Sequence, residues 1–292
     1  MPAAAPDLAA LETLRRANPE WSVWLEILAE TMRTGREPGW TRHRVVRDTP
    51  TAPGTPALAG AVFTIDGGLA RGWIDRILGI AARGEGPAAS LRALRSVDVF
   101  DILDAALADD PARLDTMAQA AGADVRAVRA MAGPLVMPLL QSHGAAGAGA
   151  SETWTQGYCP TCGAWPALTE VRGLEGSRYL RCLRCGGDWR TEWLSCPFCG
   201  ESDHERLGSL VPEDARQTRK VDVCRSCRGF VKSVTVLSAR PRAEVPVLDL
   251  ETVDLDLAAL NHGFTRPEGV GYPLAARARE RRGGLRDRLR WS

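Results

Sequence analysis

Lysine, histidine and tyrosine are scarce in this chain of 292 residues, which contains two Lys, four His and three Tyr. Positive charge is therefore carried almost wholly by arginine, and 37 basic residues balance 36 acidic ones to a net charge of +1. A net charge this small indicates no polyanionic partner. The histidines are scattered, at His43, His143, His204 and His262. Ser, His and Asp form no nucleophile-elbow pattern, so the sequence offers no catalytic triad.

Long apolar runs are also missing, since no stretch approaches the roughly 18 apolar residues of a membrane-spanning helix. The first residues, "MPAAAPDLAALETLRR", lack a basic segment and carry Asp7 and Glu12 early, so they do not resemble a signal peptide. We therefore expect a cytoplasmic protein, in which paired cysteines indicate metal or redox chemistry more often than structural disulfides.

Residues 1–143 are predicted to form a helical bundle domain, because apolar residues recur there at helical spacing. Asn18 and Pro19 form a helix-start pair, and the helix after them is predicted to end near Gly35. Its apolar stripe consists of Trp21, Trp24, Leu25, Leu28 and Met32. Further helices are predicted over about 69–83 and 97–108, after Asp110, and from Asp124 to Gly133. Core packing, not a cofactor groove, is our interpretation of the Trp and Met stripes.

Small residues in "GAAGAGASET" predict a linker over 144–153, and their glycine spacing does not match a dinucleotide fingerprint. From Trp154 to about Leu237, short alternating runs predict strands. A closing helix that packs back is predicted within 241–268, and a basic tail over 269–292. From Arg277 to Arg290, seven Arg stand against two acidic residues. We interpret this tail as a solvated, frayed end, with binding to an anionic surface as the alternative.

The eight cysteines all lie between 159 and 227 and form four C-x-x-C pairs. The pairs are Cys159/Cys162, Cys182/Cys185, Cys196/Cys199 and Cys224/Cys227. Four pairs so close together are a strong signal for metal binding. Sequential pairing predicts two tetracysteine modules, over 154–195 and 196–240, while an interleaved arrangement stays open.

Turn chemistry supports this prediction, because two residues between thiolates let a tight turn aim both sulfurs at one ion. In "CPTCG", "CLRCG" and "CPFCG" the following glycine suits the left-handed conformation that such a turn needs. "CRSCRG" departs from the pattern, because Arg228 follows Cys227, and we expect this fourth knuckle to be looser.

Tetrathiolate sites suit zinc and iron about equally, so the ligands do not choose the metal. Four protein ligands close the site, which makes it structural or, at most, electron-transferring, and disfavours hydrolysis at the metal. A catalytic dithiol is the weaker interpretation, because no thioredoxin-type βαβ pattern accompanies the pairs. His204 follows Cys199 closely enough to be a ligand, but every pair is already complete.

A zinc-ribbon protein that binds nucleic acid or acts as a scaffold is the alternative function. Twelve basic and eleven acidic residues lie between 151 and 237, and eight thiolates with two divalent ions would bring the region to about −3. Arg178, Arg181, Arg184 and Arg190 could form a local basic patch, but the acidic Asp188 and Glu192 lie among them. Nucleic-acid binding is therefore disfavoured.

The cysteine region resembles the FdhE family of formate dehydrogenase accessory proteins. The resemblance lies in "GYCPTCGAWP", "GSRYLRCLRCGGDWRTEWLSCPFCG", "CRSCRGFVKSVTVL" and "VPVLDLETVDLDLAALNHGF", and the early "RANPEWSVWLEILAE" resembles the family's first helix. It covers most of residues 12–268, is strongest over 157–237, and does not extend to the basic residues 277–290.

This resemblance implies an α+β multidomain fold, with a helical N-terminal bundle followed by tandem rubredoxin-like or zinc-ribbon-like modules and a closing helix. It implies iron bound by the eight cysteines, with zinc as the alternative. It also implies contact with the catalytic subunit of a molybdenum- or tungsten-dependent formate dehydrogenase during its maturation. The family contributes no catalytic residue, so we expect an accessory protein, not an enzyme.

Overall fold

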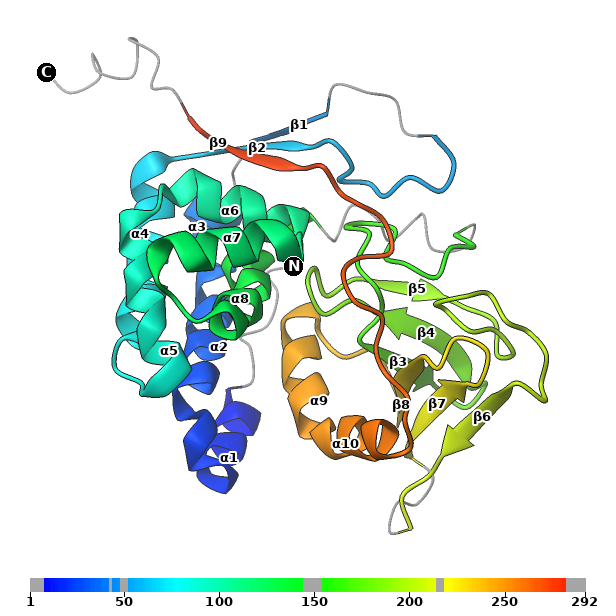
Figure 1. Ribbon diagram of the computed structural model, residues 1–292. Coiled ribbons are helices and arrows are strands. Elements are labelled where there is room, and N and C mark those ends of the chain that lie inside the picture. The colour runs from blue at the N-terminus through cyan, green and yellow to red at the C-terminus, as the bar shows by residue number, and fades with distance from the viewer. Residues whose placement is uncertain (1–7, 42–43, 48–51, 144–153, 214–217, 282–292) are drawn as a thin grey trace, which may run out of the picture.

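The computed structural model describes residues 8–41, 44–47, 52–143, 154–213 and 218–281. Helices fill its N-terminal part, while a mixed sheet carries the cysteines in its C-terminal part (Figure 1). The chain is thus a mixed α+β protein, as the sequence predicts. The predicted linker over 144–153 and most of the basic tail lie outside the described residues. None of the described helices is long and apolar enough to cross a membrane.

Helices account for most of the described N-terminal residues. They are α1 (Ala9–Ala17), η1 (Pro19–Trp21), α2 (Ser22–Thr34), α3 (Pro38–Thr41), α4 (Gly67–Ala81), α5 (Gly86–Ser90), η2 (Leu91–Ser96), α6 (Val99–Ala108), α7 (Pro111–Ala121) and α8 (Val125–His143). Asp110 starts α7 as predicted, since its side chain accepts hydrogen bonds from the N–H groups of Ala112 and Arg113. Asn18 does not cap α2, because Pro19 begins a short 3₁₀ turn and α2 starts only at Ser22.

The prediction that the helix from Asp124 stops at Gly133 is wrong. Helix α8 continues through Pro134 and Pro138 to His143. Each proline removes a backbone donor from the helix, but the turns around them are buried in the main core, and this packing outweighs the lost hydrogen bond. Trp73 of α4 donates its indole N–H to the carbonyl of Leu135 at 3.0 Å, inside that core. Trp73 is therefore a residue of the core.

A small sheet that the sequence did not predict lies against the helices. It consists of β1 (Arg44–Val46), β2 (Val62–Ile65) and β9 (Arg277–Glu280), in the order β1-β2-β9. Strand β9 runs parallel to β2 and crosses above the helices (Figure 1). The expectation of a frayed end is therefore wrong for Arg277–Glu280. Ala278 is buried on the helical side, and its N–H donates to the carboxylate of Asp104 on α6.

The two cysteine-bearing regions share one six-stranded sheet. Its strands are β3 (Leu168–Arg172), β4 (Ser177–Arg181), β5 (Asp188–Arg190), β6 (Leu207–Leu210), β7 (Arg219–Cys224) and β8 (Phe230–Val236), in the order β5-β4-β3-β8-β7-β6. Strands β3 and β8 pair in parallel, with Leu168 opposite Lys232. One antiparallel meander from each region thus joins the other along this central pair.

The closing segment packs on one face of this sheet as two helices instead of the single predicted helix. After η4 (Arg242–Glu244) come α9 (Val245–Glu251) and α10 (Val253–Asn261), divided at Thr252. The hydroxyl of Thr252 bonds the carbonyls of Leu248 and Asp249, which ends α9 there. Helix α10 ends at Asn261, and Gly263 just beyond it has a φ of 74°, a left-handed conformation that suits glycine after a helix end.

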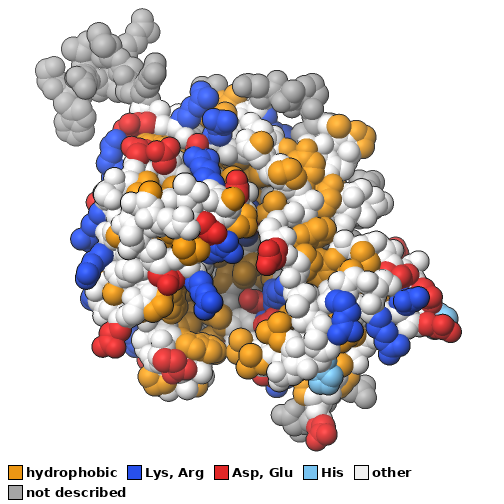
Figure 2. Space-filling view, in the orientation of Figure 1, with side chains coloured by type: hydrophobic (Ala, Val, Ile, Leu, Met, Phe, Trp, Pro, Cys, Tyr) orange, Lys and Arg blue, Asp and Glu red, His pale blue; other side chains and the backbone are white. Residues whose placement is uncertain are grey.

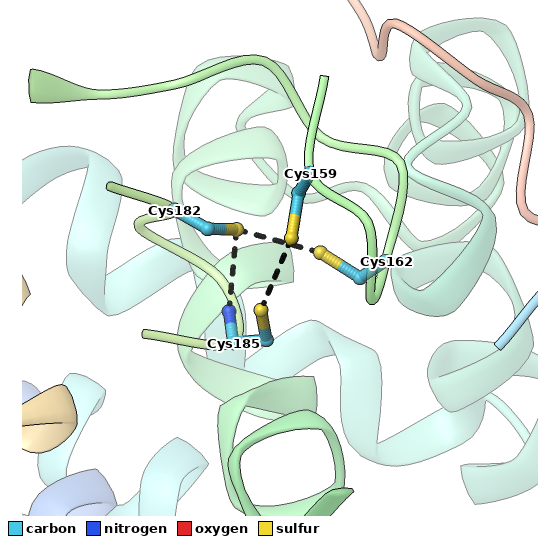
Figure 3. Close-up of side chains that lie close together, drawn as sticks. All are labelled: Cys159, Cys162, Cys182 and Cys185. Atoms are coloured by element: carbon cyan, nitrogen blue, oxygen red, sulfur yellow. Dashed lines mark hydrogen bonds between the residues drawn. The ribbon is translucent and has the colours of Figure 1, made fainter. Parts of the chain in front are cut away.

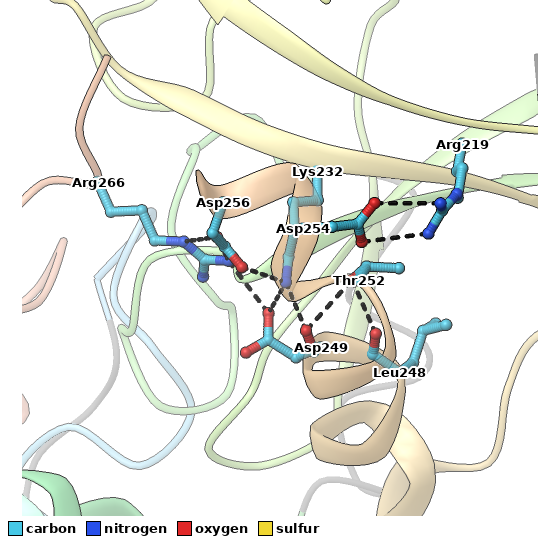
Figure 4. Close-up of polar contacts among 8 residues, drawn as sticks. All are labelled: Arg219, Lys232, Leu248, Asp249, Thr252, Asp254, Asp256 and Arg266. Carbon is cyan, nitrogen blue, oxygen red and sulfur yellow. Dashed lines mark hydrogen bonds and ion pairs between the residues drawn. The ribbon is translucent and has the colours of Figure 1, made fainter. Parts of the chain in front are cut away.

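A buried charge cluster fixes these helices to the sheet (Figure 4). The Lys232 side chain on β8 is completely buried, and its ammonium lies 2.8 Å from Asp249 of α9 and 2.7 Å from Asp256 of α10. Arg266 contacts the same two carboxylates, at 3.1 and 2.6 Å. Two cations thus balance two anions, which a buried charge requires.

Candidate metal centres

Four cysteines converge at what we call the first centre: Cys159, Cys162, Cys182 and Cys185 (Figure 3). The first pair precedes β3, and the second pair lies between β4 and β5. The Sγ atoms of Cys159 and Cys185 are 3.4 Å apart, as are those of Cys162 and Cys182. All four side chains are 0% exposed, and they lie within the main hydrophobic core.

Backbone N–H groups point at these sulfurs, as a thiolate site requires. Thr161 and Gly187 donate to Cys159 and Cys185, each at 3.4 Å, and the N–H of Cys185 donates to Cys182 at 3.5 Å. Such bonds spread the negative charge of thiolates around a cation. A side chain at Gly187 would crowd the site, because a Cβ atom there would lie 3.2 Å from the sulfur of Cys185.

The first centre is also fixed to the N-terminal part of the chain. The carbonyls of Pro160 and Thr161, inside the first knuckle, accept hydrogen bonds from the N–H groups of Ala57 and Leu58 at 2.7 and 2.9 Å. In the second knuckle, the Arg184 guanidinium donates to the carbonyl at the end of α6, on Ala106, at 2.7 Å. This centre therefore lies at the junction of the two parts of the protein.

The other four cysteines form a second centre: Cys196, Cys199, Cys224 and Cys227. The Sγ atoms of Cys196 and Cys227 lie 3.7 Å apart, and those of Cys199 and Cys224 lie 3.8 Å apart. Here only Cys196 and Cys224 are buried, whereas Cys199 and Cys227 are exposed. The knuckles thus pair sequentially along the chain, and the interleaved arrangement is not the one that forms.

The fourth knuckle has the same backbone conformation as the other three, although it lacks their glycine. Gly163, Gly186 and Gly200 have φ values of 72°, 68° and 74°, and Arg228 has a φ of 60° at the equivalent place. A non-glycine residue in this conformation carries a cost of roughly 1–2 kcal/mol. The guanidinium of Arg228 offsets it by donating to the carbonyl of Gly263 at 2.9 Å. The expected loosening is therefore not seen in the backbone.

The electrostatics of both centres call for a cation. Burial raises the pKa of the Cys159 thiol well above its ordinary value, and burial also raises the pKa of the Cys196 thiol in the second centre. Four sulfurs this close cannot all ionise by themselves, because each negative charge opposes the next. A divalent or trivalent metal ion removes that opposition. His204 takes no part, since its side chain is 79% exposed and points to Asp203.

Three of the four arginines considered for a basic patch are buried inside the protein. Arg178, Arg181 and Arg184 are buried, and only Arg190 of the four is exposed. Arg181 is paired with the buried Glu170 at 2.7 Å, which makes it part of the structure of the sheet. Figure 2 shows basic and acidic side chains interspersed over the visible face.

An aromatic contact that the sequence did not predict joins the two centres. Trp165 follows the first knuckle, Phe198 lies inside the third, and their ring centroids are 5.6 Å apart in an edge-to-face arrangement. Beside them, Gly157 touches Pro197 so closely that a Cβ atom would lie 1.7 Å from its carbonyl oxygen. The sequence signal for this contact was the position of the two aromatic residues, one just after the first knuckle and one within the third.

Three known proteins that are similar to this chain are named FdhE or FdhE homolog. A protein named FdhE homolog from Aquifex aeolicus (strain VF5) is 30% identical over 127 residues, which are 41% of this chain and 44% of the relative. An FdhE homolog from Stutzerimonas stutzeri (strain A1501) is 35% identical over 114 residues, 38% of this chain and 36% of the relative. Protein FdhE from Escherichia coli O127:H6 is 29% identical over 111 residues, 37% of this chain and 35% of the relative.

These alignments span less than half of each relative, and no family model matches the chain. The fold has a wider counterpart in the crystal structure of the FdhE protein from Pseudomonas aeruginosa. That structure matches with a TM-score of 0.58 at 21% identity, over 94% of this chain and 97% of the other. Together these matches confirm the resemblance that the cysteine motifs indicate.

Proposed function

We propose that this protein, a relative of the FdhE proteins, is an accessory factor that binds the catalytic subunit of formate dehydrogenase and supports its maturation. The names of the relatives and the pattern of cysteine motifs support the role. The observation that carries the proposal is the packing of all eight cysteines into two closed groups of four. The reduced thiols of this arrangement fit a cytoplasmic protein.

Each group fits one tetrahedrally bound metal ion. With metal–sulfur bonds of about 2.3 Å, a tetrahedron of thiolates has edges of about 3.8 Å. The sulfur separations of 3.7 and 3.8 Å in the second centre match this edge, and those of 3.4 Å in the first are slightly shorter. We propose iron in rubredoxin-like sites, with zinc as the alternative, and the eight cysteines as its ligands.

The closed ligand set also supports an accessory role over catalysis. Four cysteine ligands leave a metal no open position for a substrate. Within the described residues, clusters of three or more potential ligands occur only at these two centres. A bound iron would supply structural cross-linking and, through its change of valence, electron transfer.

Genetic complementation with co-purification tests the proposal. In a host that makes formate dehydrogenase, deletion of this protein should abolish that activity, and the wild-type chain should restore it. The tagged wild-type chain should also retain the catalytic subunit of formate dehydrogenase during purification. Full activity after deletion would refute the accessory role. Binding to nucleic acid with a steep salt dependence, and no retained subunit, would favour the zinc-ribbon alternative instead.

An absorption spectrum tests the choice of metal. Chain purified without oxygen and then oxidised should show ferric–thiolate bands in the visible region, and a reductant should bleach them. A colourless protein that contains only zinc would refute the iron assignment and leave the two metal centres in place.

A further inference from the structure

The two centres differ sharply in their access to solvent. Every cysteine of the first centre is completely buried, whereas Cys199 and Cys227 of the second are exposed. Accessible thiolates react with incoming ligands and reagents, and buried ones are inert. The four cysteine ligands of the second centre should therefore react with incoming ligands more readily than those of the first.

Packing reinforces this difference. The first centre belongs to the large core shared with the helices, next to Leu180 and Trp189. Opening it would separate knuckle carbonyls from the N–H groups of Ala57 and Leu58 and expose apolar surface. The hydrophobic cluster beside the second centre is small and includes Val223 of β7. A local opening there disrupts far fewer contacts.

Two cavities reach the second centre. A cleft of about 590 Å³ has Cys196 and Cys199 in its wall, together with the aromatic rings of Trp154, Trp165 and Phe198. A smaller pocket of about 200 Å³ has Cys196 and Cys224 in its wall. No cysteine of the first centre lines either cavity. Cys199 is thus the ligand that is both exposed and open to the larger cleft.

We infer that the second centre is a ligand-exchange site, at which a thiol-bearing molecule enters the aromatic cleft and displaces Cys199 from the metal. The first centre keeps its metal as long as the protein stays folded. This inference rests on the proposed binding of metal by the two cysteine groups. It assigns the cleft a class of ligand, soft thiolates, which prefer the same metals as the cysteines do.

The exchange step conserves charge and electrons. The incoming thiol loses its proton, its sulfur forms a bond to the metal, and the bond from the metal to Cys199 breaks. Cys199 takes up a proton and becomes a thiol. No oxidant or reductant is required, and repetition of the step transfers the ion to the incoming ligand.

Zinc release from the full chain tests the inference. The protein is loaded with two Zn²⁺ and mixed with glutathione, and a chromophoric chelator reports free zinc. One zinc per chain should leave about 100-fold faster than the other, because exchange at an open site needs no unfolding of the core. The fast rate should rise with glutathione concentration, and the slow rate should not. Two zinc ions that leave in one phase would overturn the inference.

Cysteine labelling assigns the phases without any variant. Iodoacetamide added after the fast phase should modify only the cysteines of the second centre, as read by peptide mass spectrometry. Modification of Cys159 or Cys182 at that stage would overturn the assignment. Formate dehydrogenase plays no part in this experiment, so its outcome is separate from the accessory role. A chain that binds no zinc or iron would instead refute the metal centres themselves.

A variant that fills the cleft tests the route. Thr155 is exposed and lines the cleft, so Thr155→Trp should slow the fast phase by obstructing the approach to Cys199. Thr116→Trp, an equal substitution at an exposed position on α7, is the control and should leave the rate unchanged. An unchanged fast phase in Thr155→Trp would overturn the route through the cleft.

Discussion

The guanidinium of Arg228 lies over the ring of Phe264, with its central carbon 4.5 Å from the ring centroid. This contact joins the fourth cysteine knuckle to the chain that leaves α10. Hydrogen bonds from the same guanidinium to the carbonyls of His262 and Gly263, at 3.2 and 2.9 Å, strengthen it. The residue that departs from the glycine pattern therefore holds the second centre against the closing helices.

Two substitutions separate the backbone cost at Arg228 from the value of its contacts. Both Arg228→Ala and Arg228→Gly lose the guanidinium, but only alanine keeps the cost of a φ near 60°. We expect Arg228→Ala to lower the free energy of unfolding more than Arg228→Gly does, by about 1 kcal/mol. Chemical denaturation of the metal-loaded proteins measures this difference. A glycine variant less stable than the alanine variant would contradict the assignment.

The only two lysines of the chain provide a matched pair of substitutions. Lys232→Met leaves Asp249 and Asp256 with Arg266 as their one shared cation, so we expect a loss of about 3–5 kcal/mol in the free energy of unfolding. Lys220→Met removes a partly exposed partner of Asp222, which Arg178 also contacts, and should cost at most about 1 kcal/mol. Equal losses in the two variants would contradict the buried-cluster account.

Stability should depend on pH through Asp104 of α6. Burial raises the pKa of this carboxyl above its ordinary 3.8, although the N–H of Ala278 bonds it. A raised folded-state pKa favours the fold when the group is protonated, and that contribution disappears as pH rises through the folded pKa. Asp104→Asn should therefore unfold at a higher temperature than wild type at pH 7. The difference between the two unfolding temperatures should narrow as pH falls toward 3.8. A difference in unfolding temperature that stays constant across this pH range would show that Asp104 is not the source of the pH dependence.

Loss of one ligand should affect the two centres unequally. Cys162→Ala removes a ligand from the buried core and should lower the unfolding midpoint by roughly 10 °C or more, because metal binding there contributes to folding of both parts. Cys199→Ala opens an exposed site and should lower the midpoint much less. Scanning calorimetry of the two metal-loaded variants measures this. A larger loss in Cys199→Ala would reverse the roles assigned to the centres.

The features that the sequence predicted correctly are those that depend only on neighbouring residues. The C-x-x-C spacing and the following glycines indicated the knuckles, and Asp110 indicated the start of α7. These features depend on a few neighbouring residues, so they can be read from the chain directly. The departure at Arg228 was also visible, although its contacts with Gly263 and Phe264 were not.

Features that depend on distant residues could not be predicted in this way. Strand β9 exists because Arg277–Glu280 pairs with Val62–Ile65, more than 200 residues earlier. The continuation of α8 through Pro138 depends on burial against the rest of the core. The unequal exposure of Cys162 and Cys199 depends on which surfaces the helices cover. The C-x-x-C spacing, which the two centres share, therefore gave no sign that one centre is buried and the other exposed.

Metal stoichiometry tests the central claim most directly. Native mass spectrometry of chain purified without oxygen should show two metal ions per wild-type molecule. Cys162→Ser and Cys199→Ser should each retain one ion, because each serine removes one ligand from a different group of four. A wild-type chain without metal, or a count that neither substitution changes, would contradict the assignment of two tetrathiolate centres.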